Sequence, residues 1–101
     1  MFGLNETARL YRREGQRGGK PFYTVQGTLF RCRTQPMTQR VTGGTALARA
    51  GEMKVFCEAL PVAAGDRIVT KDGAGWIVKE VRVRRGLNTL HHLELLVTAE
   101  G

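Results

Sequence analysis

The residues that could carry out acid–base chemistry are few, and they lie in the C-terminal part of the chain. They are Asp66, Asp72, Glu80, His91, His92 and Glu94. General acid–base catalysis requires such groups to converge in a pocket, and nucleophilic catalysis requires a nucleophile beside an activating base. The sequence places no Ser or Cys nucleophile in an activated setting beside His91 or His92. We therefore expect that the protein is not an enzyme.

The acidic candidates have structural explanations. Asp72 falls in a cluster of turn residues, where an Asp side chain commonly bonds to the nearby backbone. Glu80 stands close to Lys79 and Arg82 in the sequence, and Glu94 lies on a predicted strand. Ion pairs between strands account for both glutamates. These carboxylates are therefore expected to stabilise turns and strands.

The two cysteines, Cys32 and Cys57, each fall in a predicted strand. They could pair, but the N-terminal sequence has no secretion signal, so we expect reduced thiols in the core of a cytoplasmic protein. Two cysteines are too few for a zinc site, and the neighbours His91 and His92 point to opposite faces of a strand. The sequence predicts no metal site and no cofactor.

The elements that position these residues are strands. Between residues 65 and 97, three runs of β-branched and apolar residues are separated by two turn clusters, which predicts an antiparallel meander. Alternation along its second run predicts that Val81 and Val83 share a face with Ile77. The opposite face is expected to carry Trp76, Val78, Glu80, Arg82 and Arg84. One face of the third run is expected to carry His91, Leu93, Leu95 and Val97.

Further strands are expected earlier in the chain. Residues 6–13 favour a strand, and residues 22–33 predict a long one with a bulge or sharp bend near Gly27. Residues 52–60 alternate well and end at Pro61. Their apolar face is expected to carry Met53, Val55, Cys57 and Ala59.

Residues 34–51 are polar and weakly patterned, and Pro36 and Gly43-Gly44 interrupt them. They predict one long loop, either a loose excursion or an arm that reaches a neighbour or ligand. The whole chain, residues 1–101, is then a single all-β domain. We expect a small antiparallel β-barrel or sandwich of about six strands, with no membrane-spanning segment.

The chain is basic, with a formal net charge of +7. Such a balance is typical of a domain that meets nucleic acid or an acidic protein surface, although it also favours solubility. Four basic residues lie in the turn cluster at 15–21 or close to it in sequence. They are Arg12, Arg13, Arg17 and Lys20. They form either a solvated hairpin tip or a contact for phosphate or an acidic partner.

A small basic barrel could also be an OB-like nucleic-acid-binding module, which stacks bases on aromatic rings set among Lys and Arg. The available rings are Tyr23, Phe30, Phe56 and Trp76. Trp76 follows a glycine turn and is expected to be partly exposed. The core is short of aromatic residues and is expected to use most of the other rings. This alternative stays open.

Three C-terminal segments carry a family resemblance. They read Ala-Gly-Asp-Arg-Ile-Val at 64–69, Trp-Ile-Val-Lys-Glu-Val at 76–81 and His-His-Leu-Glu-Leu-Leu-Val at 91–97. Together they resemble the C-terminal half of the small head-closure or head–tail connector proteins of tailed bacteriophages. The resemblance covers about a third of the chain, from Ala64 to Val97.

The resemblance implies a structural virion subunit without catalytic residues. Family members are small β-barrels that form a ring below the portal, seal the filled capsid and dock the tail. The expected partners are copies of the chain, the portal or adaptor protein, tail proteins and packaged double-stranded DNA. The expected location is the virion neck, after assembly in the host cytoplasm. A tail-terminator-type virion protein is a close alternative.

In some family members a long loop projects into the channel and helps to hold the DNA. Residues 34–51 stand where that loop would be, and their lack of acidic residues suits a surface that faces DNA. The channel-facing residues implied by this match are Arg40, Thr42, Gly43, Gly44 and Arg49.

Overall fold

The computed structural model describes residues 4–40, 46–85 and 91–100, with side chains described at all of these except 37–40, 46–50, 85 and 91. The described residues form eight strands and no helix. The strands are β1 (Glu6–Tyr11), β2 (Arg13–Arg17), β3 (Lys20–Tyr23), β4 (Thr28–Arg40), β5 (Ala46–Glu58), β6 (Arg67–Thr70), β7 (Gly75–Arg85) and β8 (His91–Ala99).

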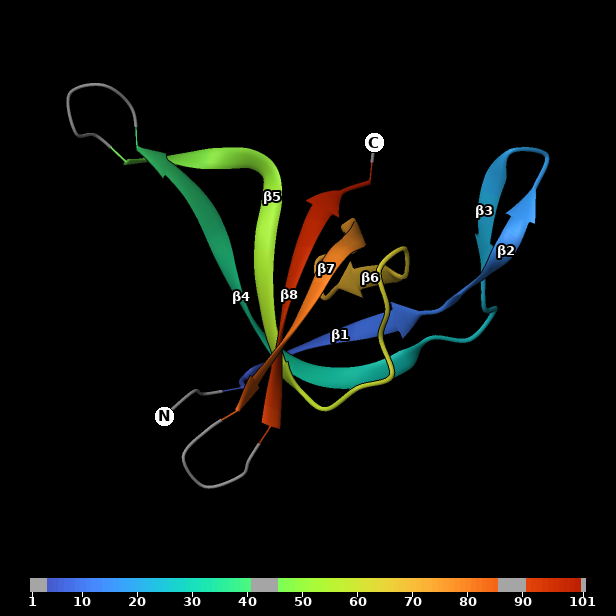
Figure 1. Ribbon diagram of the computed structural model, residues 1–101, viewed down its shortest axis with the longest axis horizontal. Helices are drawn as coiled ribbons and strands as arrows, with labels where there is room; N and C mark the ends of the chain where they lie inside the picture. Colours follow the sequence, from blue (N-terminus) through green and yellow to red (C-terminus); the bar gives the residue numbers. More distant parts are fainter. Residues whose placement is uncertain (1–3, 41–45, 86–90, 101) are drawn as a thin grey trace.

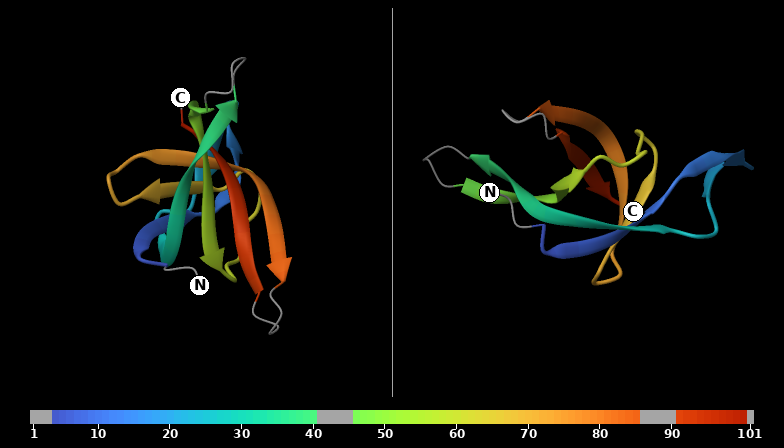
Figure 2. Two further views of the ribbon diagram at one scale, coloured as in Figure 1. Left: turned by 90° about the vertical axis from the view of Figure 1, so that its left-hand side faces the viewer. Right: turned by 90° about the horizontal axis from the view of Figure 1, so that it is seen from below.

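Six of these strands close into an antiparallel barrel in the order β1-β4-β5-β8-β7-β6 (Figure 1). The short strand β1 completes the barrel because it pairs with β4 on one edge and with β6 on the other. Strands β2 and β3 form a separate two-stranded sheet. Figure 2 shows that this small sheet stands away from the barrel. The prediction of an all-β antiparallel barrel is confirmed.

One apolar core fills the barrel. Its buried members are Ala8, Leu10, Phe30, Cys32, Val55, Cys57, Ile68, Val78, Leu93, Leu95 and Val97. The faces predicted for β5 and β8 are confirmed at the buried residues, and Val55 and Cys57 lie opposite Leu95 and Leu93 in the pairing of these strands. The prediction is wrong for Ala59, which is exposed and follows the last residue of β5. Burial of these aliphatic side chains is the main favourable term in folding.

The predicted meander is confirmed, but its second strand carries a bulge that the sequence does not reveal. Val78 pairs with Val97 while Glu80 pairs with Leu96, so Lys79 is an extra residue in β7. An extra residue shifts the period-two alternation by one place. Val81 therefore lies on the inner side with Val78, and the prediction that it shares a face with Ile77 is wrong.

The predicted strand at 22–33 is two strands. β3 ends at Tyr23 and β4 begins at Thr28, with a non-strand connection between them. Gly27 lies in this connection, and a Cβ atom placed there would sit 2.8 Å from Cζ of the Tyr11 ring. The chain therefore changes direction close to the predicted bend, at a site where close packing excludes a side chain.

The long loop predicted at 34–51 is wrong in extent, because strand structure continues through most of it. β4 runs on to Arg40, and β5 begins at Ala46. Residues 41–45 lie outside the described residues. The two strands pair along this hairpin, with a register shift between Pro36 and Thr38. Gly51, with a φ of 79°, lies in β5 opposite this irregular region.

The hairpin extends past the barrel. β1 pairs with β4 only as far as Cys32, and β8 pairs with β5 only from Glu52 onward. The outer halves of β4 and β5 therefore pair only with each other. No core lies against a hairpin that leaves a barrel, so its sequence needs no apolar alternation, and this explains why the segment resembled a loop.

Because one of two leucines lies in the core and the other on the surface, we expect their substitutions to differ in the loss of stability. Leu95 is fully buried, whereas Leu29 is 60% exposed on β4. We expect Leu95→Ala to lower the free energy of unfolding by about 2–5 kcal/mol, since it removes buried methyl groups and leaves a cavity. The matched variant Leu29→Ala should cost less than about 0.5 kcal/mol. Urea unfolding followed by Trp76 fluorescence measures both, and equal losses would contradict this assignment of the core.

Candidate functional site

The hairpin formed by β2 and β3 is largely exposed. Its tip is the pair Gly18 and Gly19, with φ angles of 60° and 79°. A two-residue turn with both φ angles positive matches the twist of a β-hairpin and favours glycine. Arg17 and Lys20 flank this turn as a cross-strand pair. The sequence thus builds a short ribbon with two cations at its end.

All four basic residues predicted as a partner contact lie on this hairpin or at its base. Arg12, Arg13, Arg17 and Lys20 are exposed. The guanidinium of Arg17 lies 5.0 Å from the centroid of the Phe22 ring. Gly15 pairs with Phe22 across the hairpin and leaves room for that ring. The structure therefore brings these cations together, while binding to a partner stays a prediction.

Asp66 anchors the base of the hairpin to the barrel. Its carboxylate is buried, with only 4% of the residue exposed. Oδ1 accepts a hydrogen bond of 2.9 Å from the backbone N–H of Arg13, and Oδ2 accepts one of 2.9 Å from that of Ala63. The main-chain oxygen of Asp66 accepts a third from Val78 at 2.9 Å. Asp66 therefore has a structural role.

A second link at the hairpin base joins its two ends. The N–H of Thr24 donates to the carbonyl oxygen of Arg12 at 2.9 Å, and the N–H of Arg12 donates to Oγ1 of Thr24 at 3.2 Å. These contacts, with those of Asp66, fix where the ribbon leaves the barrel. The sequence alone reveals neither a role for Thr24 nor the partner of Asp66, because both contacts join residues distant in the chain.

The predicted channel-facing residues are only partly described. Arg40 is the last residue of β4, and Arg49 lies within β5, so both belong to the extended hairpin. Thr42, Gly43 and Gly44 lie outside the described residues. The backbone therefore places Arg40 and Arg49 on the arm that leaves the barrel, and their contact with DNA stays a prediction.

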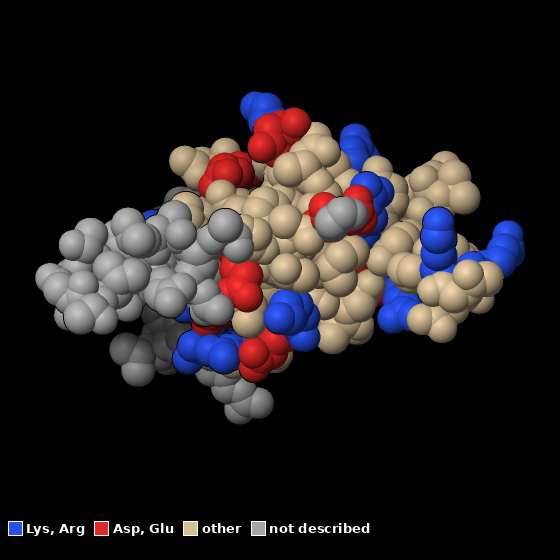
Figure 3. All heavy atoms as spheres, turned by 90° about the horizontal axis from the view of Figure 1, so that it is seen from above, with Lys and Arg blue, Asp and Glu red and all other residues tan. Residues whose placement is uncertain are grey.

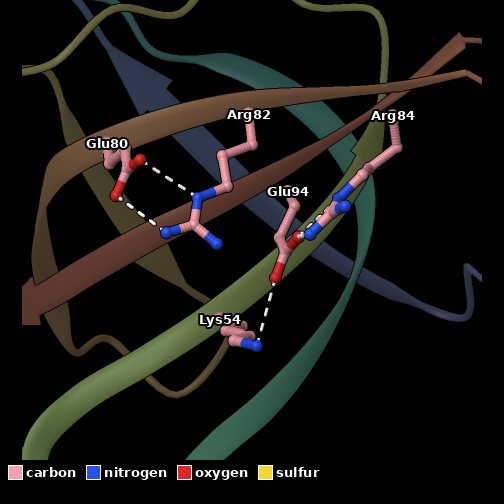
Figure 4. A network of polar contacts seen from close by, with 5 residues as sticks. All are labelled: Lys54, Glu80, Arg82, Arg84 and Glu94. Atoms are coloured by element: carbon pink, nitrogen blue, oxygen red, sulfur yellow. Dashed lines mark hydrogen bonds and ion pairs between the residues drawn. The ribbon is translucent and has the colours of Figure 1, made fainter.

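On the outer surface of the barrel, acidic and basic side chains pair with each other (Figure 4). The Glu94 carboxylate on β8 lies 2.8 Å from Nη2 of Arg84 on β7 and 3.2 Å from Nζ of Lys54 on β5. The predicted cross-strand pairing of Glu94 is confirmed. Glu80 instead pairs with Arg82 two residues along the same strand, at 3.0 Å.

Glu94 is unusual because it lies on the outer face of the barrel and is nevertheless buried. Only 5% of the residue is exposed. Burial by itself would raise the pKa of Glu94, but the hydrogen bonds and charges of Arg84 and Lys54 outweigh it and lower the pKa below 4.5. The carboxylate is therefore held ionised, as a structural ion pair requires.

The two cysteines face each other across β4 and β5. Cys32 and Cys57 are paired residues in the ladder, and both are buried and free. Burial raises the pKa of the Cys32 thiol to about 11 and that of Cys57 to about 12. A thiol with such a pKa is almost entirely protonated at neutral pH and is a poor nucleophile. The prediction of core cysteines is confirmed.

Among the acid–base candidates, Asp66, Asp72 and Glu94 lie in three different parts of the fold. Asp66 holds the hairpin base, Glu94 lies in the outer ion-pair network, and Asp72 accepts a hydrogen bond of 3.2 Å from the backbone of Ala74 in the β6–β7 turn. Within the described residues, no group of three or more His, Cys, Asp or Glu side chains could hold a metal ion. His91 has no described side chain. Asp66, Asp72 and Glu94 thus serve structural roles.

One hollow of about 390 Å³ opens beside the β6–β7 turn. It is lined by Glu6, Thr34, Met53, Thr70, Lys71, Asp72 and Trp76. Its Glu6 carboxylate accepts hydrogen bonds of 2.9 Å from the backbone N–H and from Oγ1 of Thr34, which joins β1 to β4. The Glu6 carboxylate therefore serves the fold.

No known protein family and no curated protein matches the chain in sequence. Along the part of the chain that the structure describes, no helix is long and apolar enough to cross a membrane. Function must therefore be inferred from the described geometry and charge, together with the resemblance of the C-terminal segments.

The ion pairs of Glu94 predict a pH dependence of stability. The folded-state pKa lies below the reference value of 4.5, so the stabilisation is complete above about pH 4.5 and is lost as pH falls through the folded-state pKa. We expect Glu94→Gln to lower the free energy of unfolding by roughly 1–2 kcal/mol at pH 7, a reduced figure because both cations remain partly exposed. The difference from the wild type should shrink between pH 5 and pH 3 in urea titrations, and a constant difference would contradict the assignment.

The anchor predicts a second stability effect. Asp66→Asn replaces one acceptor oxygen by an NH₂ donor that must face a backbone N–H. We expect a loss of about 1–3 kcal/mol in the free energy of unfolding and faster amide exchange at Arg13 and Ala63. The matched variant Asp72→Asn lies in an exposed turn that tolerates Asn, so it should cost less. Equal costs for the two variants would contradict an anchoring role for Asp66.

Proposed function

We propose that the chain is a structural subunit of a phage head–tail connector. In this role, copies of the chain form a ring between the portal or adaptor protein and the tail, and help to retain packaged DNA in the virion neck. The subunit performs no chemistry. Support comes from the barrel fold, from the C-terminal segments that resemble this family, and from the arms that leave the barrel.

The observation that carries the proposal is the extension of the β4–β5 hairpin. β4 and β5 keep pairing with each other as far as Arg40 and Ala46, beyond the last partners that β1 and β8 provide. Each outer half therefore has one edge without a partner strand among the described pairings. Unpaired backbone groups along such an edge can accept another chain by strand addition.

An arm of this kind suits ring assembly. A closed ring of identical subunits requires heterologous contacts, in which one surface of a subunit meets a different surface of its neighbour. The β4–β5 arm leaves one side of the barrel and the β2–β3 hairpin leaves the other (Figures 1 and 2). Two dissimilar projections on opposite sides are consistent with head-to-tail contact between copies.

A reconstitution experiment tests the proposal. DNA-filled heads are prepared from the phage that carries this gene after the gene has been deleted, and the purified chain is added. We expect added chain to restore DNA retention against nuclease and to permit tail joining. Heads that keep their DNA and join tails equally well without the chain would overturn the connector role.

The arm can be tested in the same assay. Arg40→Ala combined with Arg49→Ala should lower DNA retention without changing the thermal unfolding midpoint, because both residues lie on the arm outside the barrel pairing. Lys71→Ala with Lys79→Ala removes the same charge from the β6–β7 turn and the β7 bulge and serves as the control. Retention equal to that of the wild type in the arm variant would refute the contact of the arm with DNA.

A further inference from the structure

The β2–β3 hairpin concentrates positive charge that nothing else in the structure explains. Residues 12–24 contain four Lys or Arg and a single acid, Glu14. Among the described residues, none of these four cations forms an ion pair, whereas cations on the barrel, such as Lys54, Arg82 and Arg84, do. Figure 3 shows basic side chains at the end of the molecule where Figure 1 places β2 and β3.

We infer that this hairpin is a DNA-binding ribbon that lies in the major groove of duplex DNA and contacts the phosphates on both sides of the groove. This inference goes beyond the connector role, because it adds a second contact with DNA on a hairpin other than the β4–β5 arm. It can also be tested with the purified chain alone.

The dimensions of the ribbon match the groove. The major groove of B-DNA is about 12 Å wide and admits a two-stranded β-ribbon. The hairpin has two strands and no more, since its sheet contains only β2 and β3 among the described residues. Its tip is Gly18-Gly19, and a Cβ added at either glycine would meet no atom within 4 Å. A tip without side chains leaves room for Arg17 and Lys20 to approach the phosphates closely.

The spacing of the cations fits phosphates on two strands. Arg17 and Lys20 flank the tip, whereas Arg12 and Arg13 lie at the base. The four steps along β2 from Arg13 to Arg17 correspond to about 13 Å at roughly 3.3 Å per residue. This length is close to the groove width, so the tip pair can contact one DNA strand while the base pair contacts the other.

Two further contacts prepare the hairpin for such binding. Stacking of Arg17 over Phe22 restricts its long side chain, which reduces the conformational entropy lost when the guanidinium binds a phosphate. The bond from Arg13 N–H to buried Asp66 fixes the base of the ribbon on the barrel. The ribbon is therefore presented in one orientation. Because its contacts are with phosphates, binding is expected to be independent of sequence.

The test measures the affinity of the purified chain for a labelled 24-base-pair duplex by fluorescence anisotropy, between 50 and 200 mM salt. The variants are Arg17→Gln with Lys20→Gln at the tip, and Arg12→Gln with Arg13→Gln at the base. Each variant removes two phosphate contacts, so each should weaken binding roughly 60-fold at 0.1 M salt. The plot of log K against log salt should become shallower, with the magnitude of its negative slope reduced by about 1.8. Unchanged thermal unfolding midpoints show that the variants are folded.

The control is Lys71→Gln with Lys79→Gln, which removes the same charge from the barrel. A loss as large as that of the hairpin variants would show a diffuse charge effect and overturn the inference. Absence of duplex binding by the wild type at 50 mM salt would also overturn it. Tighter binding to single-stranded DNA of the same length would exclude the groove, and equal binding to poly-glutamate would favour an acidic protein partner instead.

Discussion

Closure of the barrel depends on β1, the short strand that pairs with β4 on one edge and with β6 on the other. β1 ends at Tyr11, and its partner β4 begins at Thr28. The residues between them have no place in the barrel wall, so they form a hairpin outside it. The buried carboxylate of Asp66 then holds the start of that hairpin beside the loop at Ala63. The position of the basic ribbon thus follows from how the barrel closes.

The barrel interior and the two projections have different roles. Aliphatic side chains and two protonated thiols fill the barrel, and the acids that the sequence offered for catalysis are occupied in turns, anchors and ion pairs. The β4–β5 arm leaves the barrel with unpartnered strand edges, and the β2–β3 hairpin leaves it with unpaired charge. These two features support contacts with other macromolecules, which is the basis for proposing a structural subunit that meets both protein and DNA.

Ion pairs on the barrel explain why positive charge is distributed unevenly between the barrel and the β2–β3 hairpin. On the barrel, Glu94 pairs with Lys54 and Arg84, and Arg67 is bound by Glu100 through two hydrogen bonds of 2.6 and 2.8 Å. Each pair is worth little at the surface but neutralises its part of the field. The hairpin has four cations and one acid, so its field is left uncompensated. Exposed cations such as Lys71 and Lys79 also remain on the barrel, but the hairpin gathers four cations on one short ribbon.

The sequence by itself determined the all-β class, the meander, the buried faces of β5 and β8 and the basic character of the hairpin, because these follow from local alternation and turn residues. Only the tertiary structure decided the bulge at Lys79, the extension of β4 and β5 through the expected loop, and the anchor at Asp66. The bulge changes which face of β7 every later residue occupies. The outer halves of β4 and β5 form a hairpin without a core against it, so they need no apolar pattern. The buried Asp66 carboxylate accepts its hydrogen bond from Arg13, 53 residues away in the chain. None of these leaves a local signal in the sequence.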